Sequence, residues 1–210
     1  MSKKKIIVAP NSFKECADSV TISKLIESHL CQFENIELVL KPISDGGDGF
    51  LKVCEFYFGG EYRIYRITTP YDESIFDCMV LYCIDRKEIY IESAEVLGLK
   101  QVPDEYRKPL NLSSKGMGDL LNLIQRDVNE RIIEVDKVII GIGGTATIDL
   151  GLGMMSELGL TLFETDHNEI DVLPMNFLEV NEFVYNKINF EFDVKLITDV
   201  ENPLFGDMVA

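Results

Sequence analysis

Hydrophobic residues near the start of the chain come in short runs that polar loops separate. Residues 5–9 (KIIVA) and 36–40 (IELVL) are continuous apolar runs, which are typical of buried strands. A helix is expected after each of them, over 19–32 and over 49–57. This alternation of strand, loop and helix predicts an α/β fold with a mostly parallel sheet, in which sites lie at the C-terminal ends of the strands.

The pattern changes at Tyr62, where strand-like runs separated by short polar turns begin. Such runs are typical of antiparallel hairpins. The elements expected further along are helices from about residue 117 and over about 150–158, and strands at 136–142, 160–163 and 194–200. We therefore expect two domains. Residues 1–60 form the first part of a discontinuous α/β sheet domain, and residues 61–210 form a second α/β domain with a mixed sheet and a glycine-rich loop.

The net charge of −16 excludes some partners. Nucleic acids and anionic membranes need basic patches, so neither is expected to bind. An anionic small substrate would have to be met by local cations or a metal. The five cysteines are odd in number and show no CxxC spacing, and the chain has no run of ~20 apolar residues that could span a membrane. We expect a soluble, cytoplasmic protein, and its oligomeric state is not fixed by the sequence.

The stretch GIGGTATIDLGLGM (141–154) concentrates glycine after a predicted buried strand. Such a cluster marks backbone that bends tightly or approaches something closely, commonly a phosphate at a helix N-terminus. The stretch lacks the lysine of a Walker A loop. Gly141, Gly143 and Ala146 fit the dinucleotide pattern G-x-G-x-x-A, with Glu164 as the acid for the ribose. An NAD(P)-dependent oxidoreductase and a purely structural turn therefore stay open as alternatives.

Further polar residues favour a metal–nucleotide complex over a redox cofactor. Gly144, Thr145, Thr147 and Asp149 add hydroxyls and a carboxylate to the glycine-rich loop, and these groups suit phosphate-bound Mg²⁺. Three other predicted strand ends carry polar residues. These are Asn11, Ser12 and Lys14 at the first, Asp45 and Asp48 around Gly46 and Gly47 at the second, and Asp199 and Asn202 at the third. Each group alone is equally typical of a surface turn. Together they predict one convergent site.

Several motifs occur in the order found in the bacterial glycerate kinases, and the chain resembles this family over essentially its whole length. The motifs are KIIVAPNSFKECADS, PISDGGDGF, IYIESAEVLGL, SSKGMGDLL, GIGGTATIDLGLGM and TDVENPLFG. The resemblance implies a two-domain α/β architecture, in which a mixed-sheet domain is inserted into a flavodoxin-like parallel-sheet domain. It also implies transfer of a phosphoryl group from MgATP to D-glycerate in the cleft between the domains.

We expect the following roles for the residues that match the family's motifs or the loops described above. The catalytic residues are Lys14, Asp45 and Asp149; the substrate-binding residues are Asn11, Ser12, Gly46, Gly47 and Asn202; the nucleotide-binding residues are Gly141, Gly143, Gly144 and Thr145; and the metal ligands are Asp149 and Asp199. Asp45 is expected to accept the proton of the substrate hydroxyl.

The chain also departs from the family's pattern. The family usually has aspartate at Asn11, threonine at Phe50 and Met117, and Asn-Asp-Gly-Gly where Ile148 and Leu150 flank the aspartate. A catalytically inactive relative therefore stays open as an alternative. Family members also continue through a long C-terminal portion, and we expect this portion to be missing here. We expect apolar faces without partners, self-association of the chain alone, and no measurable kinase activity without that portion.

Overall fold

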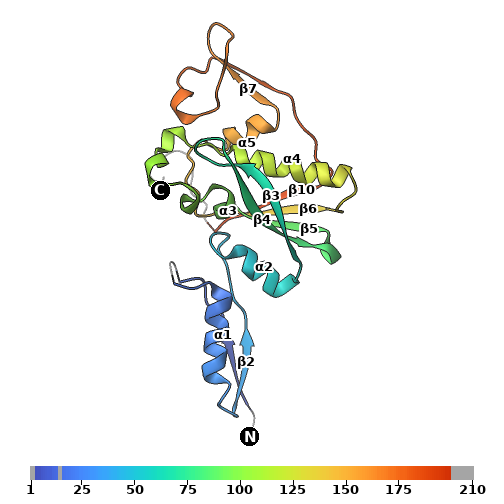
Figure 1. Cartoon of the computed structure of the whole chain (residues 1–210). Helices are drawn as coiled ribbons and strands as arrows, with labels where there is room; N and C mark the ends of the chain where they lie inside the picture. The colour runs from blue at the N-terminus through green and yellow to red at the C-terminus, as the bar shows by residue number, and fades with distance from the viewer. Residues whose placement is uncertain (1–2, 14–15, 200–210) are drawn as a thin grey trace.

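The centre of the molecule is a mixed five-stranded sheet with a helix layer on each face (Figure 1). The computed structural model describes residues 3–13 and 16–199. The strand order is β10 (Asp193–Ile197), β6 (Lys137–Gly141), β5 (Glu88–Glu92), β4 (Ile75–Cys83) and β3 (Glu61–Thr68). The first three strands run parallel, and β3, β4 and β5 form the antiparallel hairpins that the polar turns predict.

Two apolar cores lie on the two faces of this sheet, because successive side chains of a strand point to opposite faces. In β4, Val80 and Tyr82 join the core beneath α4 (Lys115–Asn129), whereas Leu81 joins the core beneath α2 (Phe50–Phe58). A fully buried aliphatic side chain of this kind stabilises the fold by roughly 1.5–3 kcal/mol. The two cores therefore fix the sheet between α4 and α2.

The packing of α2 bears on the expected domain division. The sequence assigns α2 to residues 1–60, but the helix packs against β4 and β5 of the five-stranded sheet. Phe50 and Leu51 are buried in that contact. By its packing, α2 belongs with the sheet of the second unit, while the division at residue 61 itself stays a prediction.

A smaller parallel unit lies at the N-terminal end of the molecule (Figure 1). It consists of β1 (Lys4–Val8) paired with β2 (Ile36–Leu40), and of α1 (Ser19–Leu30). The side chain of Asp18 caps α1 by accepting a hydrogen bond from the Thr21 amide at 2.8 Å. The α/β fold class, with one parallel pair and one mixed sheet, is confirmed.

The prediction that residues 5–9 form a buried strand is wrong for this chain, and the last described strand is exposed as well. Ile7 of β1 is 64% exposed and Leu196 of β10 is 65% exposed. Within the described residues, β1 and β2 form a sheet of only two strands. Such a narrow sheet offers no broad face against which a second layer of helices could pack. The expectation of uncovered apolar strand faces is therefore confirmed.

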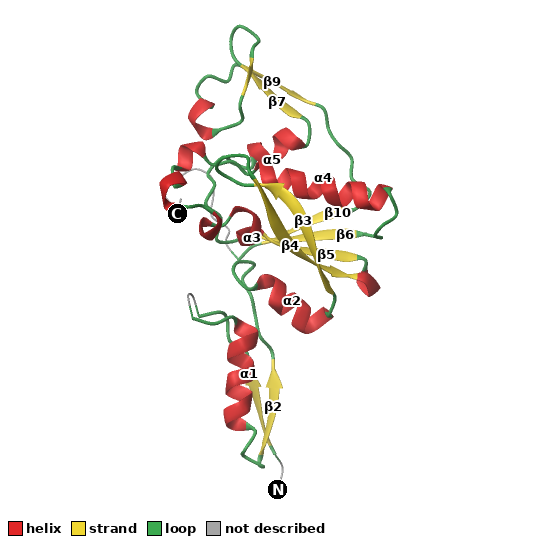
Figure 2. Ribbon diagram, viewed as in Figure 1, coloured by secondary structure: helices red, strands yellow, loops and turns green. Residues whose placement is uncertain are grey.

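The remaining elements connect these units or form the end of the molecule opposite to β1. They are α3 (Ser93–Leu97), α5 (Leu152–Glu157), a 3₁₀ turn at Ile84–Arg86, three more at Leu99–Gln101, Asp104–Tyr106 and Pro109–Asn111, another at Pro174–Asn176, and the antiparallel strands β7 (Leu160–Phe163), β8 (Glu169–Ile170) and β9 (Glu182–Tyr185). Figure 2 shows β7 and β9 beyond α5. In the part of the chain that is described, no helix is long and apolar enough to cross a membrane.

We expect the uncovered apolar faces to drive self-association of this chain, because contiguous exposed apolar surface tends to be an interaction surface. Replacing both Ile7 and Leu196 by lysine should lower the associated fraction in sedimentation velocity at equal protein concentration. The control pair Ser28→Lys and Gln32→Lys adds the same charge at exposed polar positions and should leave association unchanged. A wild-type chain that sediments as a monomer contradicts this expectation.

Candidate functional site

Most of the predicted site residues that are described meet at one cleft of about 1050 Å³ beside the ends of β6 and β10. The predicted residues that line it are Ser12, Asp45, Gly47, Gly143, Gly144 and Asp199. Asn11 lies directly behind this lining, since its side-chain amide donates a hydrogen bond to Asp45 Oδ2 at 3.4 Å. Lys14 and Asn202 lie outside the described residues.

The glycines of the two loops allow backbone to pack against backbone. A Cβ atom on Gly143 would lie 2.7 Å from the Cα atom of Gly47, and one on Gly141 would lie 2.5 Å from the carbonyl oxygen of Gly46. Gly46 itself has a φ of 98°, a conformation that favours glycine. The contact between the loops thus explains three of the glycines without any ligand. Gly144, by contrast, is exposed and has a φ of 63°.

The carboxylate of Asp45 is held at the edge of this contact. Its Oδ1 accepts a hydrogen bond from the Gly47 amide at 2.9 Å, and its Oδ2 accepts the one from Asn11. The Asn11 side-chain oxygen in turn accepts a hydrogen bond from the Ser12 amide at 2.8 Å. The first loop therefore positions Asp45 in the cleft through a short chain of hydrogen bonds.

Two further residues of this site lie at the end of β5 and directly after it, and the sequence reasoning gave neither a role. The Ser93 hydroxyl lies 3.0 Å from both the amide nitrogen and the carbonyl oxygen of Gly143, and so clamps the glycine-rich loop. Glu92 is only 4% exposed and accepts hydrogen bonds from the amides of Gly49 and Leu51 at the start of α2, at 3.1 and 3.2 Å. The acidic and hydroxyl residues directly after the IYI run were the signal that could have found them.

Burial raises the pKa of Glu92, and the hydrogen bonds from the two amides oppose that rise. The described lining of the cleft is acidic as a whole. It contains two lysines, Lys52 and Lys100, and seven carboxylates, Asp18, Asp45, Asp48, Glu55, Glu92, Glu95 and Asp199. A polyanion would therefore enter this cleft more readily with bound cations.

Asp149 and Thr145 are not among the residues that line the cleft. Asp149 is 1% exposed, and its carboxylate accepts hydrogen bonds from the Ser114 amide and hydroxyl, both at 2.7 Å. It also accepts hydrogen bonds from the amides of Gly151 and Gly153, at 3.2 and 3.1 Å. These contacts join the N-termini of α4 and α5 and favour an anchoring role, so the catalytic and metal-binding roles of Asp149 stay predictions.

The strand–helix–strand context that a dinucleotide site requires is not formed. After α5, the chain enters β7, which pairs antiparallel with β8 and β9 rather than parallel with β6. Glu164 does not line the cleft, and its carboxylate accepts a hydrogen bond from the Asn168 side chain at 2.6 Å. The G-x-G-x-x-A spacing alone therefore does not make a Rossmann site here.

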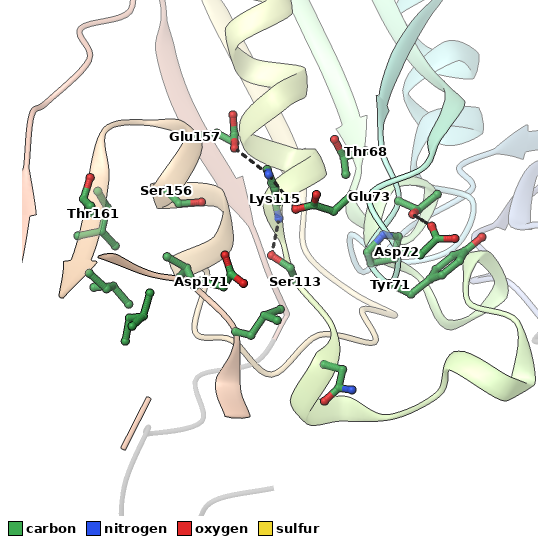
Figure 3. A pocket seen from close by; sticks show the side chains of 18 of the residues that line it. Thr68, Tyr71, Asp72, Glu73, Ser113, Lys115, Ser156, Glu157, Thr161 and Asp171 are labelled. Carbon is green, nitrogen blue, oxygen red and sulfur yellow. Dashed lines mark hydrogen bonds and ion pairs between the residues drawn. The ribbon is translucent and has the colours of Figure 1, made fainter. Parts of the chain in front are cut away.

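A second cavity of about 450 Å³ lies between the β3–β4 turn and the β7–β8 segment (Figure 3). Lys115 lies in it, with its Nζ atom 3.0 Å from Glu73 and 3.6 Å from Glu157. None of the predicted site residues lines this cavity. The larger cleft is therefore the candidate functional site.

The departures from the family's pattern have different structural settings. Phe50 and Met117 are buried in the two cores, where apolar side chains fit. Ile148 is exposed, and Leu150 has a φ of 57°, in the left-handed region that strains residues with a side chain. The substitution at Leu150 is thus the one with a visible backbone cost.

Replacing Gly143 by alanine should lower the free energy of unfolding by about 1–3 kcal/mol, the usual range for overpacking. The added methyl group would meet the backbone of Gly47, which cannot rotate away. Gly47→Ala is the matched control, because its methyl group would first meet the Asp45 side chain at 3.2 Å. We expect a smaller loss for the control in urea unfolding, and equal losses would contradict the proposed loop contact.

Replacing Leu150 by glycine should raise the free energy of unfolding by about 1 kcal/mol, because left-handed backbone strains other residues by roughly 1–2 kcal/mol. The side chain is 67% exposed, so little burial is lost. Leu150→Ala keeps the strain and should bring no gain. If both variants gained equally in thermal and urea unfolding, the exposed side chain rather than the backbone would be the cause.

Comparison with known proteins identifies the family of this chain. The model of the glycerate kinase family matches residues 6–210. The chain is 28% identical to a glycerate kinase of Neisseria meningitidis serogroup B, over 98% of this chain and 54% of that relative. It is 31% identical to a glycerate 2-kinase of Escherichia coli strain K12, over 97% of this chain and 52% of that relative.

A solved structure agrees with these relatives. The crystal structure of a protein from Salmonella typhimurium LT2, assigned as glycerate kinase 2, superposes with a TM-score of 0.76 at 27% identity. The match covers 99% of this chain and 55% of that one. The chain thus spans about half the length of the relatives that it matches. Since the family model covers nearly all of the sequence, this chain belongs to the glycerate kinase family.

Proposed function

We propose that this chain forms part of a kinase that transfers the γ-phosphoryl group of MgATP to a hydroxyl of D-glycerate, giving phosphoglycerate. The observation that carries the proposal is the packing of the Gly46–Gly47 loop against the glycine-rich loop, with Asp45 held at their shared cleft. Phosphoryl transfer needs positioning and charge neutralisation more than covalent help from the protein. A rigid contact between two loops supplies positioning.

The phosphates of ATP would lie along Gly143, Gly144 and Thr145. Gly144 supports this placement, because it is exposed and has no side chain to keep a phosphate away from its amide. Gly143 cannot contribute its amide freely, since that amide already donates to Ser93. Gly141 would act behind the cleft, by letting the loops approach each other.

Glycerate would lie beside the first loop. Ser12 lines the cleft, and Asn11 positions Asp45, which would accept the proton of the attacking hydroxyl. Lys14 keeps its proposed catalytic role, as a cation for the glycerate carboxylate or the transferring phosphoryl group, and Asn202 keeps its proposed role in substrate binding. Both lie outside the described residues. The hydroxyl oxygen would then attack the γ-phosphorus, and the bond from that phosphorus to the bridging oxygen of ADP would break.

The donor set of the cleft fits Mg²⁺, which prefers carboxylate, phosphate and water oxygens. Within the described residues, no group of three or more acidic, histidine or cysteine side chains lies close enough together to hold a metal by itself. We propose that the metal arrives with the nucleotide and that Asp199, which lines the cleft, would help to hold it. When bound, Mg²⁺ would neutralise negative charge on the phosphates.

The alternatives are less well supported. The NAD(P)-dependent oxidoreductase lacks its strand–helix–strand unit, because β7 belongs to another sheet. A catalytically inactive relative would share the fold, so only a measurement of turnover can distinguish it from an active kinase. We place the proposed reaction in the cytoplasm, since the five cysteines are free thiols and two of them, Cys16 and Cys31, are exposed.

We expect Asp45→Asn to lower kcat by about 10²–10⁴-fold, the usual contribution of a general base, while the affinity for MgATP changes little. The assay uses this chain with the C-terminal half of a glycerate kinase supplied as a second polypeptide, D-glycerate, MgATP and identification of the product. Asp72→Asn, at the exposed β3–β4 turn, is the control and should retain wild-type turnover. A wild-type complex without turnover contradicts the proposed function. A fully active Asp45→Asn variant contradicts only the role of Asp45 as general base and leaves the proposed function standing.

A further inference from the structure

Lys100 is a partly exposed lysine in the lining of the cleft, which Gly143 and Gly144 of the glycine-rich loop also line. Its Nζ atom lies 2.6 Å from Glu95 Oε1 and 3.6 Å from Asp48 Oδ1. The other lysine of the described lining, Lys52, has a different setting. Its Nζ atom lies 2.9 Å from Asp18, the residue that caps α1.

The segment that carries Lys100 is joined to the glycine-rich loop at three points. The first is the Ser93 clamp on Gly143 described above. The second is the hydrogen bond from the Ala146 amide to the Leu97 carbonyl at 2.8 Å, and the third is a β-bridge that pairs residue 98 with residue 145. A ligand that binds the loop therefore meets a segment whose position is fixed relative to that loop.

Asp48 connects Lys100 with the exposed part of the loop. A Cβ atom on Gly144 would lie 3.8 Å from Asp48 Oδ2, while the other oxygen of the same carboxylate lies near the Lys100 ammonium. A phosphate over Gly144 would thus come within reach of the flexible lysine side chain. Lysine is a mobile point charge with three donors, which suits the many orientations of phosphate oxygens.

The charge state of Lys100 suits this task. Burial alone would lower its pKa, but the hydrogen bond to Glu95 and the nearby carboxylates outweigh burial and raise the pKa above its usual value. The amine therefore stays protonated at neutral pH. The Lys100 ammonium is thus a cation that carboxylates hold in an acidic cleft. No step of the proposed reaction described above uses this cation.

We propose that Lys100 binds the polyphosphate of the nucleotide in this cleft, exchanging its ion pairs with Glu95 and Asp48 for phosphate oxygens. The proposal rests on the proposed function, because it names the residue that receives the phosphates there. It differs from a surface ion pair in one respect that can be measured. Glu95 competes with phosphate for the same ammonium, so the two partners of the ion pair should have opposite effects on binding.

The experiment is calorimetric titration of the 210-residue chain with MgATP, with magnesium tripolyphosphate and with D-glycerate. Lys100→Met should weaken binding of both phosphate compounds by about ten- to a hundredfold, the range expected for one lost charge-assisted hydrogen bond, and leave D-glycerate affinity unchanged. Lys100→Arg should stay within a few-fold of wild type. Lys87→Met is the matched control, because it removes an ion-paired lysine whose partner, Glu134, lies outside the cleft.

Glu95→Gln is the second variant and keeps the test decisive if Lys100→Met folds poorly. Freeing the ammonium from its competitor should tighten binding of MgATP and tripolyphosphate, whereas a purely structural ion pair would make Glu95→Gln as harmful as Lys100→Met. That second result overturns the proposal. So does unchanged phosphate binding by Lys100→Met in a chain whose wild type binds MgATP, and that outcome leaves the proposed function standing. A wild-type chain that binds neither phosphate compound also overturns this proposal, whereas the proposed function is overturned only by absence of turnover in the two-polypeptide complex described above.

Discussion

The contact on which the site depends is the approach of two backbones, at Gly46–Gly47 and at Gly141–Gly143. A single added methyl group at Gly141 or Gly143 would lie within 2.7 Å of the facing loop. The end of β10 completes this contact, because the Ile142 amide donates to the Ile197 carbonyl at 2.8 Å. Three chain segments that are far apart in sequence are thereby fixed at one point. Close packing leaves them no room to slide past one another.

The site's chemistry follows from this contact. It places Asp45 and the exposed Gly144 in one cleft, and Ser93 holds the glycine-rich loop through its hydrogen bonds to Gly143. The carboxylates that surround the cleft make it unfavourable for an anion that arrives without cations. A magnesium-bound nucleotide and a lysine held in ion pairs are two ways to satisfy that constraint. The acidic lining therefore fits the proposal that anionic ligands bind in this cleft only together with cations.

Local patterns predicted the elements well, and long-range contacts were harder to see. The Asp18 cap of α1 and the β3–β4 hairpin both depend on neighbouring residues, so local patterns in the sequence are sufficient to indicate them. The exposure of β1 depends on what else covers the sheet, and an apolar run cannot report that. Asp149 looks like a metal ligand in the sequence, but it lies against Ser114, a partner 35 residues away. Glu92 and Lys100 were missed for the same reason, since each acts through a loop far along the chain.

The two glycine loops are proposed to form one ligand-binding unit. Amide hydrogen exchange followed by mass spectrometry tests it most directly, on peptides that cover residues 44–50 and 140–147. If the loops act as one unit, MgATP slows exchange in both peptides together and leaves exchange unchanged in the peptide over residues 160–173, which lies at the second cavity. Slowing in only one loop, or slowing confined to residues 160–173, would contradict it.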